Sequence, residues 1–451
     1  MNEKLKLMRE GNINKALIVL GFPTIVGLLM TGFYNFVDSY FVAQLGTEAM
    51  GAISIVYPLV TLVPGIGLSF GNGGAAYISG LLGSGEKENA EIVLSSTLFY
   101  CILTGILSQT VLLFLKPLLI LMGASSIVFP MARQYGVILI ISFLFHISSV
   151  CLMNLVRAEG AVWLSTFSQF AGSIINIILD PLLIFTFHMG IVGAAIATAI
   201  SQFIAFAILI QYYLRKKSYL KLSFKNIRFN KWIISPIFKV GFPIFAINFF
   251  QSISLSATNV AAASYGDNTI AAIGIVNRVV GMTTFAITGF SRGYQTFISF
   301  NYGAKNMDRV KKATKISYIW GISFGIVVSL CQVIFSRYIV CAFSADEKVI
   351  SIGIHALFTG SILFFTYGFQ AIAIVYLLCI KHNRAGFIFS VGRQGLFFLP
   401  VLFLASHFFN VRGILYAQSM ADLITTLLLI VYIKRLSHTD GKVIKDMQVS
   451  S

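Results

Sequence analysis

Residues 21–43 read GFPTIVGLLMTGFYNFVDSYFVA, and residues 241–263 read GFPIFAINFFQSISLSATNVAAA. Both stretches open on Gly-Phe-Pro and are long enough to cross a bilayer as a helix, which takes about 20 mostly apolar residues. The match continues without a gap over residues 21–83 and 241–303, where 15 of the 63 aligned pairs are identical. A gapless repeat of this length indicates an internal duplication of a membrane-spanning bundle.

The spacing of the two copies predicts the architecture. The offset of 220 residues contains six apolar runs, so both copies enter the membrane with the same orientation. Parallel repeats of this kind are related by an axis along the membrane normal and occur in secondary transporters. We therefore predict an all-α, polytopic integral membrane protein with twelve transmembrane helices in two six-helix bundles related by a pseudo-two-fold axis along the membrane normal. Its predicted parts are an N-terminal lobe with a cation-coupling site (1–214), a basic cytoplasmic linker (215–233), a C-terminal lobe (234–435) and a cytoplasmic tail (436–451).

The composition agrees with a membrane protein. The 451 residues are 57% hydrophobic and 11% charged, whereas soluble chains are roughly 45–50% apolar and about 25% charged. This composition argues against a soluble enzyme. Prolines inside several apolar runs are available to kink them, so bent or broken helices are expected. The twelve apolar runs fall at 14–43, 51–82, 92–115, 134–156, 161–187, 190–214, 234–263, 268–302, 316–340, 350–379, 386–407 and 411–433.

The basic residues predict the topology. With the N-terminus inside, the cytoplasmic segments hold 24 of the 33 Lys and Arg residues, the external segments hold five, and four lie near or within helices. This bias places both termini in the cytoplasm and the chain in the plasma membrane as a multi-pass protein. The net charge of +17 is explained by this topology and by attraction to anionic lipid, so no nucleic-acid partner is expected. The first run reads as a retained signal anchor.

A few acids lie inside the apolar runs. Burying a carboxylate at the centre of a membrane helix costs about 2.5–3.5 kcal/mol on insertion scales, so each such acid is a functional hypothesis. Asp38 lies in the second half of the first run, and the repeat places Thr258 at the equivalent position. Asp180 follows Asn176 by one helical turn and precedes Pro181, which can leave upstream carbonyls free for a cation. The acid at position 38 therefore belongs to one copy only.

Two chemical roles remain open for this set. Carboxylates with an amide and a hydroxyl can bind Na⁺, and they can equally relay protons. The alternative is that each acid only hydrogen-bonds a neighbouring helix; we favour function for Asp38 and Asp180. Both interpretations stay open for Asp422 in the twelfth run and Glu159 near the cytoplasmic end of the fourth. His146 is interpreted as a hydrogen-bonded core residue.

Other polar and small residues in the runs have structural interpretations. Five glycines between 65 and 74 are attributed to close helix packing. No motif for zinc proteases, serine hydrolases or P-loop ATPases is present, so we expect neither an enzyme nor an ATP-driven pump. Three arginines inside runs are expected to clamp helices together or to reach the membrane interface: Arg278, Arg292 and Arg393.

The chain resembles the multidrug and toxic compound extrusion (MATE) transporters over essentially its whole length. Each matching segment is weak alone, but their order and spacing are specific. They are the Gly-Phe-Pro openings at 21–23 and 241–243, DSYFVAQLG at 38–46, NLVRAEG at 154–160, NIILDPLLI at 176–184 and GAAIATAIS at 193–201.

The resemblance implies a cation-coupled antiporter that exports amphipathic, mainly cationic, drug-like compounds in exchange for H⁺ or Na⁺ by alternating access. In family members with a coupling site in the N-terminal lobe, that site is built from an acid, an Asn, a second acid and a Thr. These carry over to Asp38, Asn176, Asp180 and Thr198, which would also be the ligands of a Na⁺ ion. Supporting residues carried over in the same way are Tyr34, Asn154 and Pro23, the last as the bend of the first helix.

One feature departs from the Na⁺-coupled NorM type. Members of that type carry acids on the seventh and tenth helices, but Gln251 stands at the seventh-helix position and the tenth run has no acid. We expect Gln251 to be a further supporting residue of the substrate cavity. The chain therefore looks more like the DinF and MepA branch, with coupling through the N-terminal lobe. The resemblance favours H⁺ over Na⁺ as the coupling ion, no other cofactor, and a monomer in the bilayer.

Two other functions compete with drug efflux. A lipid-linked oligosaccharide flippase of the same superfamily also has paired lobes, but it usually has a more cationic cavity and often extra helices. A channel or a membrane-embedded enzyme fits poorly, since only one lobe carries the charge and no catalytic set of residues is present. Efflux measured with and without a protonophore would separate these functions.

Overall fold

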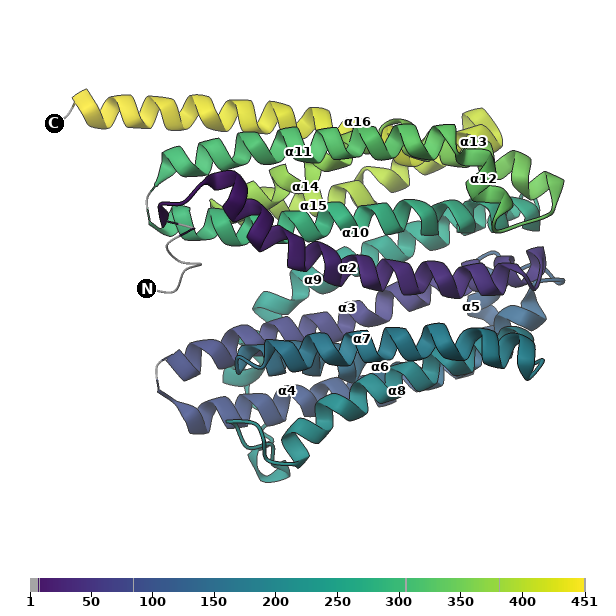
Figure 1. Cartoon of the computed structure of the whole chain (residues 1–451), viewed down its shortest axis with the longest axis horizontal. Coiled ribbons are helices and arrows are strands. Elements are labelled where there is room, and N and C mark those ends of the chain that lie inside the picture. The colour runs from purple at the N-terminus through teal and green to yellow at the C-terminus, as the bar shows by residue number, and fades with distance from the viewer. Residues whose placement is uncertain (1–6, 8, 84, 305, 381, 450–451) are drawn as a thin grey trace. The chain divides into compact units, whose positions relative to one another are not determined.

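The structure is a computed structural model that describes every residue except 1–6, 8, 84, 305, 381 and 450–451. The described residues are 88% helical and contain no strand (Figure 1). The N-terminal copy of the repeat and its following helices comprise α2 (Ile13–Ala43), α3 (Thr47–Gly83), α4 (Lys87–Leu107), η1 (Ser108–Phe114), α5 (Leu115–Leu121), α6 (Phe129–Ala158), α7 (Val162–Pro181), η2 (Leu182–Thr186) and α8 (Gly190–Leu214). The rest comprises η3 (Phe224–Asn226), α9 (Lys231–Ala263), α10 (Asp267–Gly303), α11 (Met307–Ile334), α12 (Ser336–Cys341), α13 (Glu347–Ile362), α14 (Phe364–Cys379), α15 (Asn383–Val391), η4 (Gly392–Leu396) and α16 (Phe398–Val449).

These helices provide twelve membrane spans. Ten described helical stretches are long and apolar enough to cross a bilayer, and α13 with α14, bent by 42° at their junction, makes an eleventh. The longest stretch, Asn383–Leu436, contains two spans, because Asn410 has non-helical backbone angles (φ 54°, ψ −136°) and α16 kinks there. The predicted all-α fold with twelve spans is therefore confirmed in the described part of the chain.

Lipid is the solvent of the helix surfaces. Large apolar side chains are well exposed along the spans, among them Ile178 (60%), Leu330 (56%) and Phe403 (63%). A soluble protein rarely leaves so much contiguous apolar surface in water. The chain is a multi-pass membrane protein.

The helices pack into two compact units, each described by itself. The 30–279 unit consists of Met30–Val279 with Tyr338–Gly353. The 280–451 unit consists of Val280–Arg337 and Ile354–Ser451 with Met1–Leu29. Helices α2 and α10 each contribute residues to both units. The lobe boundaries at 214 and 234 remain a prediction, because these units group residues by packing.

Helix α3 is the centre of the 30–279 unit, where it packs against α4, α6 and α9. Its glycines let backbones approach closely: a Cβ at Gly67 would lie 2.6 Å from the carbonyl oxygen of Ile147 on α6. One at Gly73 would lie 2.2 Å from that of Ile237 on α9. The packing interpretation of these glycines is confirmed.

In the 280–451 unit, the first helix of the N-terminal copy packs closely on the second helix of the C-terminal copy. A Cβ at Gly293 of α10 would lie 2.4 Å from the Cα of Gly21 on α2. Thr24 Oγ1 on α2 also donates a hydrogen bond of 2.7 Å to the carbonyl oxygen of Gly289 on α10. In the other unit, Gly241 of α9 approaches α3 in the same way. The first helix of each copy thus packs on the second helix of the other, which explains why the duplicated stretch keeps its glycines.

The helix breaks do not follow the internal prolines. The helices run without interruption through Pro23, Pro58, Pro64 and Pro243, whereas the breaks fall near Leu363 and Asn410. Neighbouring helices and local backbone adjustments can satisfy the carbonyl that a membrane proline frees, so a proline need not break its helix.

The segment that joins α8 to α9 is held against the N-terminal half of α4. The backbone N–H groups of Ser223 and Arg228 donate to the hydroxyls of Ser95 and Ser96. Leu220 of this segment is only 2% exposed. The basic linker is therefore an ordered part of the 30–279 unit.

Candidate functional site

Three helices of the 30–279 unit bring the predicted coupling residues together. Asp38 lies on α2, Asn176 and Asp180 lie on α7, and Thr198 lies on α8. Asn176 Nδ2 donates to Asp180 Oδ1 at 3.2 Å and to Thr198 Oγ1 at 3.5 Å. The carboxyl groups of Asp38 and Asp180 lie close enough to interact directly. We call these four residues the carboxyl cluster.

The local chain of α7 favours this arrangement. One turn of helix separates Asn176 from Asp180, so both side chains lie on one face. Pro181 lacks an N–H group and therefore leaves the carbonyl of Ile177 without its helical donor. Directly after it, Leu182–Thr186 forms a π-helical turn, a feature that often marks functional sites.

The carboxyl cluster has unused acceptor capacity. Asp38 Oδ1, Asn176 Oδ1 and Asp180 Oδ2 are buried and accept no hydrogen bond from the described protein. Asn176 is 1% exposed and Asp180 is fully buried. A buried acceptor without a donor costs about 1–3 kcal/mol, so these oxygens favour the binding of a proton or a cation.

Three tyrosines and an arginine surround the cluster. Tyr34, one turn before Asp38 on α2, interacts electrostatically with both carboxyl groups. Arg278 on α10 interacts with Asp38, and its guanidinium lies over the ring of Tyr57, 5.0 Å from the ring centroid. Tyr135 on α6 is within the field of both acids and of Arg278.

Sequence reasoning missed Arg278 as a member of this site. Its predicted role as a helix clamp agrees with the contact of its guanidinium with Ser54 Oγ on α3, but its interaction with Asp38 was not predicted. The available signal was an uncompensated cation in the middle of an apolar run. The helix contacts that direct it toward α2 and α3 could not be inferred from the run alone.

The other predicted supporting residues lie elsewhere on the described helices. Asn154 donates to the carbonyl of Val150 on its own helix at 2.8 Å. Pro23 is exposed and lies inside α2, in the part that belongs to the 280–451 unit. Gln251 is half-buried on α9. Their roles in transport remain predictions.

The 280–451 unit contains a second buried ionic centre. Asp422 on α16 accepts from Arg393 Nε at 2.8 Å and from Gln418 Nε2 at 3.0 Å, and it is 4% exposed. The guanidinium of Arg393 also lies over the ring of Tyr367, 4.1 Å from its centroid. Arg393 thus clamps η4 to α16, as one of the two predicted alternatives stated, and Asp422 already has its counter-ion.

Glu159 and His146 also have definite surroundings. Glu159 accepts hydrogen bonds from the hydroxyls of Tyr213 on α8 and Ser218 in the following segment, so it ties that segment to the end of α6. Arg157 Nε donates to Ser165 Oγ at 2.8 Å. The Nδ1 atom of His146 is buried and has no hydrogen-bond partner among the described residues.

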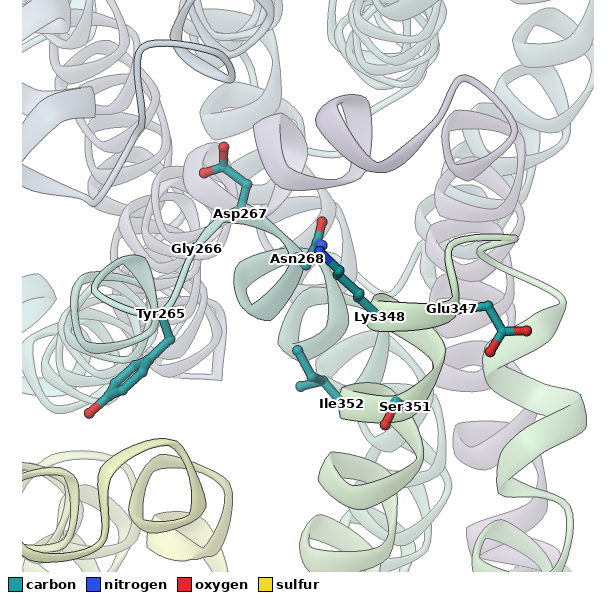
Figure 2. A pocket seen from close by; sticks show the side chains of 8 residues that line it. All are labelled: Tyr265, Gly266, Asp267, Asn268, Glu347, Lys348, Ser351 and Ile352. Carbon is teal, nitrogen blue, oxygen red and sulfur yellow. The ribbon is translucent and has the colours of Figure 1, made fainter.

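A surface hollow of about 640 Å³ lies at another place in the 30–279 unit (Figure 2). It is formed by the loop before α10 and the first turns of α13, and Asp267, Asn268 and Lys348 contribute its polar groups. Asp267 is already hydrogen-bonded by Ser125 Oγ at 2.7 Å. None of the predicted coupling residues lines this hollow.

The fold and the buried acids together define the class of the protein. Twelve spans, an internal parallel repeat and carboxylates buried within a bundle are the construction of a secondary membrane transporter.

Comparison with known proteins then gives the family. The MatE family model matches residues 23–182 and 243–404, and the chain belongs to the MatE family. The two matched segments begin 220 residues apart (243 − 23), which confirms the predicted duplication.

Individual relatives agree over nearly the full length. The chain is 29% identical over 441 residues to the multidrug export protein MepA of Staphylococcus saprophyticus, covering 96% of this chain and 97% of the relative. It is 28% identical, with the same coverage, to MepA of Staphylococcus aureus strain MSSA476. Among solved structures, an inward-facing multidrug resistance MATE family transporter of the MOP superfamily matches with a TM-score of 0.85 and 20% identity. That match covers 90% of this chain and 95% of the other.

Proposed function

We propose that this protein is a multidrug efflux antiporter that exports amphipathic, mainly cationic compounds in exchange for H⁺, with Na⁺ as the second choice of ion. The carboxyl cluster is the proposed coupling site. Full-length similarity to multidrug export proteins supports the substrate class. The observation that carries the coupling is the contact between the carboxyl groups of Asp38 and Asp180.

The geometry favours a proton. Two ionised carboxylates can only accept hydrogen bonds and cannot bond to each other, whereas a proton on either Asp38 or Asp180 supplies the missing donor. Two like charges at this separation also repel each other strongly in a buried site. One proton removes both difficulties, and Asn176 then supports the acceptor side of the pair.

The same oxygens would hold Na⁺ in the alternative. Carboxylate, amide and hydroxyl oxygens are ligands for hard cations. Asp38, Asn176, Asp180 and Thr198 offer all three types. The acceptors left without a protein donor on the first three would be the first ligands.

The exchange is energetically sufficient. Exchange of one H⁺ for a singly charged cation is electroneutral, so the pH difference drives it: one pH unit releases about 1.4 kcal/mol and supports a tenfold substrate gradient. In the proposed cycle the outward-facing cluster takes up the ion, α2 bends at Pro23, and the cavity releases the drug. The ion then leaves to the cytoplasm.

The orientation follows from the basic residues. We place both termini in the cytoplasm and the protein in the plasma membrane as a monomer, because the cytoplasmic segments then carry 24 of the 33 Lys and Arg residues. The bilayer and drug-like small molecules are its proposed partners, and no resident cofactor is needed.

Ethidium transport in everted membrane vesicles tests the proposal. An imposed pH gradient should drive ethidium uptake in the wild type, and Asp38→Asn should abolish this uptake while the protein still reaches the membrane. Asp267→Asn, which changes an acid of the same unit outside the cluster, should transport like the wild type. Wild-type uptake by Asp38→Asn would refute the assignment of the coupling site.

The choice of ion is tested in the same vesicles. A sodium gradient without a pH gradient should give little uptake if H⁺ is the coupling ion and full uptake if Na⁺ is. Transport that depends on neither gradient would instead support the flippase or the channel.

A further inference from the structure

Arg278 is a buried cation without a carboxylate partner. It lies on α10, is 7% exposed, and forms no ion pair within the described residues, where the ion pairs are those of Arg9 with Glu10 and of Arg393 with Asp422. A buried charge that lacks a partner is costly in a membrane protein and marks a functional site. The structure therefore has to compensate this guanidinium in another way.

Neutral groups hold the guanidinium in place. Arg278 Nη1 donates to the carbonyl of Gly274 at 2.9 Å and to Ser54 Oγ of α3 at 3.4 Å. The face of the Tyr57 ring lies beneath it, at 5.0 Å from the centroid. These contacts fix its position and leave its charge to act on its surroundings.

The carboxyl cluster is the negative charge in those surroundings. Arg278 interacts electrostatically with Asp38, whose carboxyl group in turn interacts with that of Asp180. The other titratable groups that face them are the phenols of Tyr34, Tyr57 and Tyr135, which are uncharged near neutral pH. All of these residues belong to the 30–279 unit.

We propose that Arg278 is the fixed counter-charge of the carboxyl cluster and sets the number of ions exchanged per substrate at one. This inference rests on the proposed antiport. Two carboxylates and one guanidinium have a net charge of −1, so a single monovalent cation neutralises the site. Without Arg278 the same carboxylates have a charge of −2, and neutralising them takes a second proton.

This charge count predicts the stoichiometry of a set of variants. The wild type exchanges one proton, Arg278→Gln exchanges two, and Asp38→Asn, which leaves Asp180 opposite Arg278, exchanges none. The double variant Asp38→Asn/Arg278→Gln again has a single uncompensated carboxylate and should exchange one proton. Glutamine keeps a hydrogen-bond donor for Gly274 and Ser54 while it removes the charge.

Two matched variants separate charge from packing. Arg278→Lys keeps the positive charge but loses the planar guanidinium, and it should still exchange one proton. Arg292→Gln removes an arginine of the same helix, about four turns further along, and this variant should also exchange one proton. If Arg278 only clamps α10 to α3, then Arg278→Lys and Arg278→Gln should change stability alone, and every variant that retains Asp38 should exchange one proton.

The measurement is proton release from purified full-length protein when tetraphenylphosphonium is added in weakly buffered, Na⁺-free detergent solution, followed with a pH dye. The expected numbers of protons are one, two, zero and one for wild type, Arg278→Gln, Asp38→Asn and the double variant. A value of one for Arg278→Gln, or of zero for the double variant, overturns the role of Arg278. If Arg278→Gln does not fold, the comparison of Asp38→Asn with the double variant decides.

Failure of the antiport proposal gives a different pattern. In that case the wild type releases no proton, or Asp38→Asn releases as many as the wild type. Both results concern the carboxyl cluster itself and are independent of position 278.

Discussion

The ion pair between Arg393 and Asp422 allows a quantitative prediction about the 280–451 unit. Two hydrogen bonds join them, Nε to Oδ1 at 2.8 Å and Nη2 to Oδ2 at 3.4 Å, and both side chains are less than 10% exposed. Removing one partner from such a pair leaves an uncompensated buried charge and costs about 3–5 kcal/mol. Replacing both by apolar residues of similar volume is far less damaging.

The magnitudes for three variants follow from these contacts. Arg393→Met leaves the carboxylate of Asp422 with Gln418 as its remaining donor, so we expect a loss of about 3–5 kcal/mol. Asp422→Leu leaves the guanidinium over the ring of Tyr367, a contact worth roughly 2 kcal/mol when desolvated, so its loss should lie near about 3 kcal/mol. The double variant should lose less than either single variant. The coupling energy should therefore exceed about 3 kcal/mol.

Unfolding in mixed detergent micelles with increasing sodium dodecyl sulfate measures these differences. Arg292→Met serves as the control, since its side chain is exposed and its loss should cost less than about 1 kcal/mol. An ordinary hydrogen bond between membrane helices is worth about 0.6 kcal/mol and at most about 1.7 kcal/mol. A measured coupling within that range would refute the interpretation of Arg393 and Asp422 as one ionic unit.

Three further predictions concern packing, the linker and the carboxyl cluster. Gly73→Ala should lower the free energy of unfolding by about 1–3 kcal/mol, because the added Cβ would collide with a backbone carbonyl. Gly80→Ala is the control: it has open space around it and should be near neutral in the same assay. Glu159→Ala should speed trypsin cleavage within residues 215–231, because the hydroxyls of Tyr213 and Ser218 lose their acceptor. Unchanged cleavage would show that the contacts with α4 alone hold this segment in place. Asn176→Leu should cut ion-driven ethidium uptake at least tenfold at wild-type expression, because Asp180 loses the donor that orients it; normal uptake would remove Asn176 from the coupling site.

Much of the fold could be predicted because the membrane imposes it. Length and hydropathy gave the twelve runs, since each must cross the same hydrocarbon thickness. The retained glycines at positions 21, 73, 241 and 293 gave the duplication, and the structure explains their retention by the close backbone approaches between α2 and α10 and between α3 and α9. The break near Leu363 falls inside a single predicted run and carries no signal such as a proline, whereas the break at Asn410 falls between the predicted runs 386–407 and 411–433.

The arrangement of the candidate site could be predicted only where helix geometry alone determines it. The one-turn spacing of Asn176 and Asp180 determines their common face, and it is visible in the sequence. The position of Arg278 depends on which face of α10 packs against α3, and that is a tertiary property. The contact of Glu159 with the linker is of the same kind, since Tyr213 and Ser218 reach it only after α8 has packed on α6.

The two buried ionic centres differ in how fully the protein compensates their carboxylates. Arg393 donates directly to Asp422, and Gln418 supplies a further donor, so the carboxylate of the 280–451 unit is fully compensated by the protein. Asp38 and Asp180 each retain a buried oxygen without a donor, although Arg278 is close enough to act on Asp38 through its field. An exchangeable ion gains free energy only where the protein has left a charge or an acceptor uncompensated. The proposed coupling through one unit agrees with where the arginines form ion pairs, and the presence of an acid in each unit does not by itself make two coupling sites.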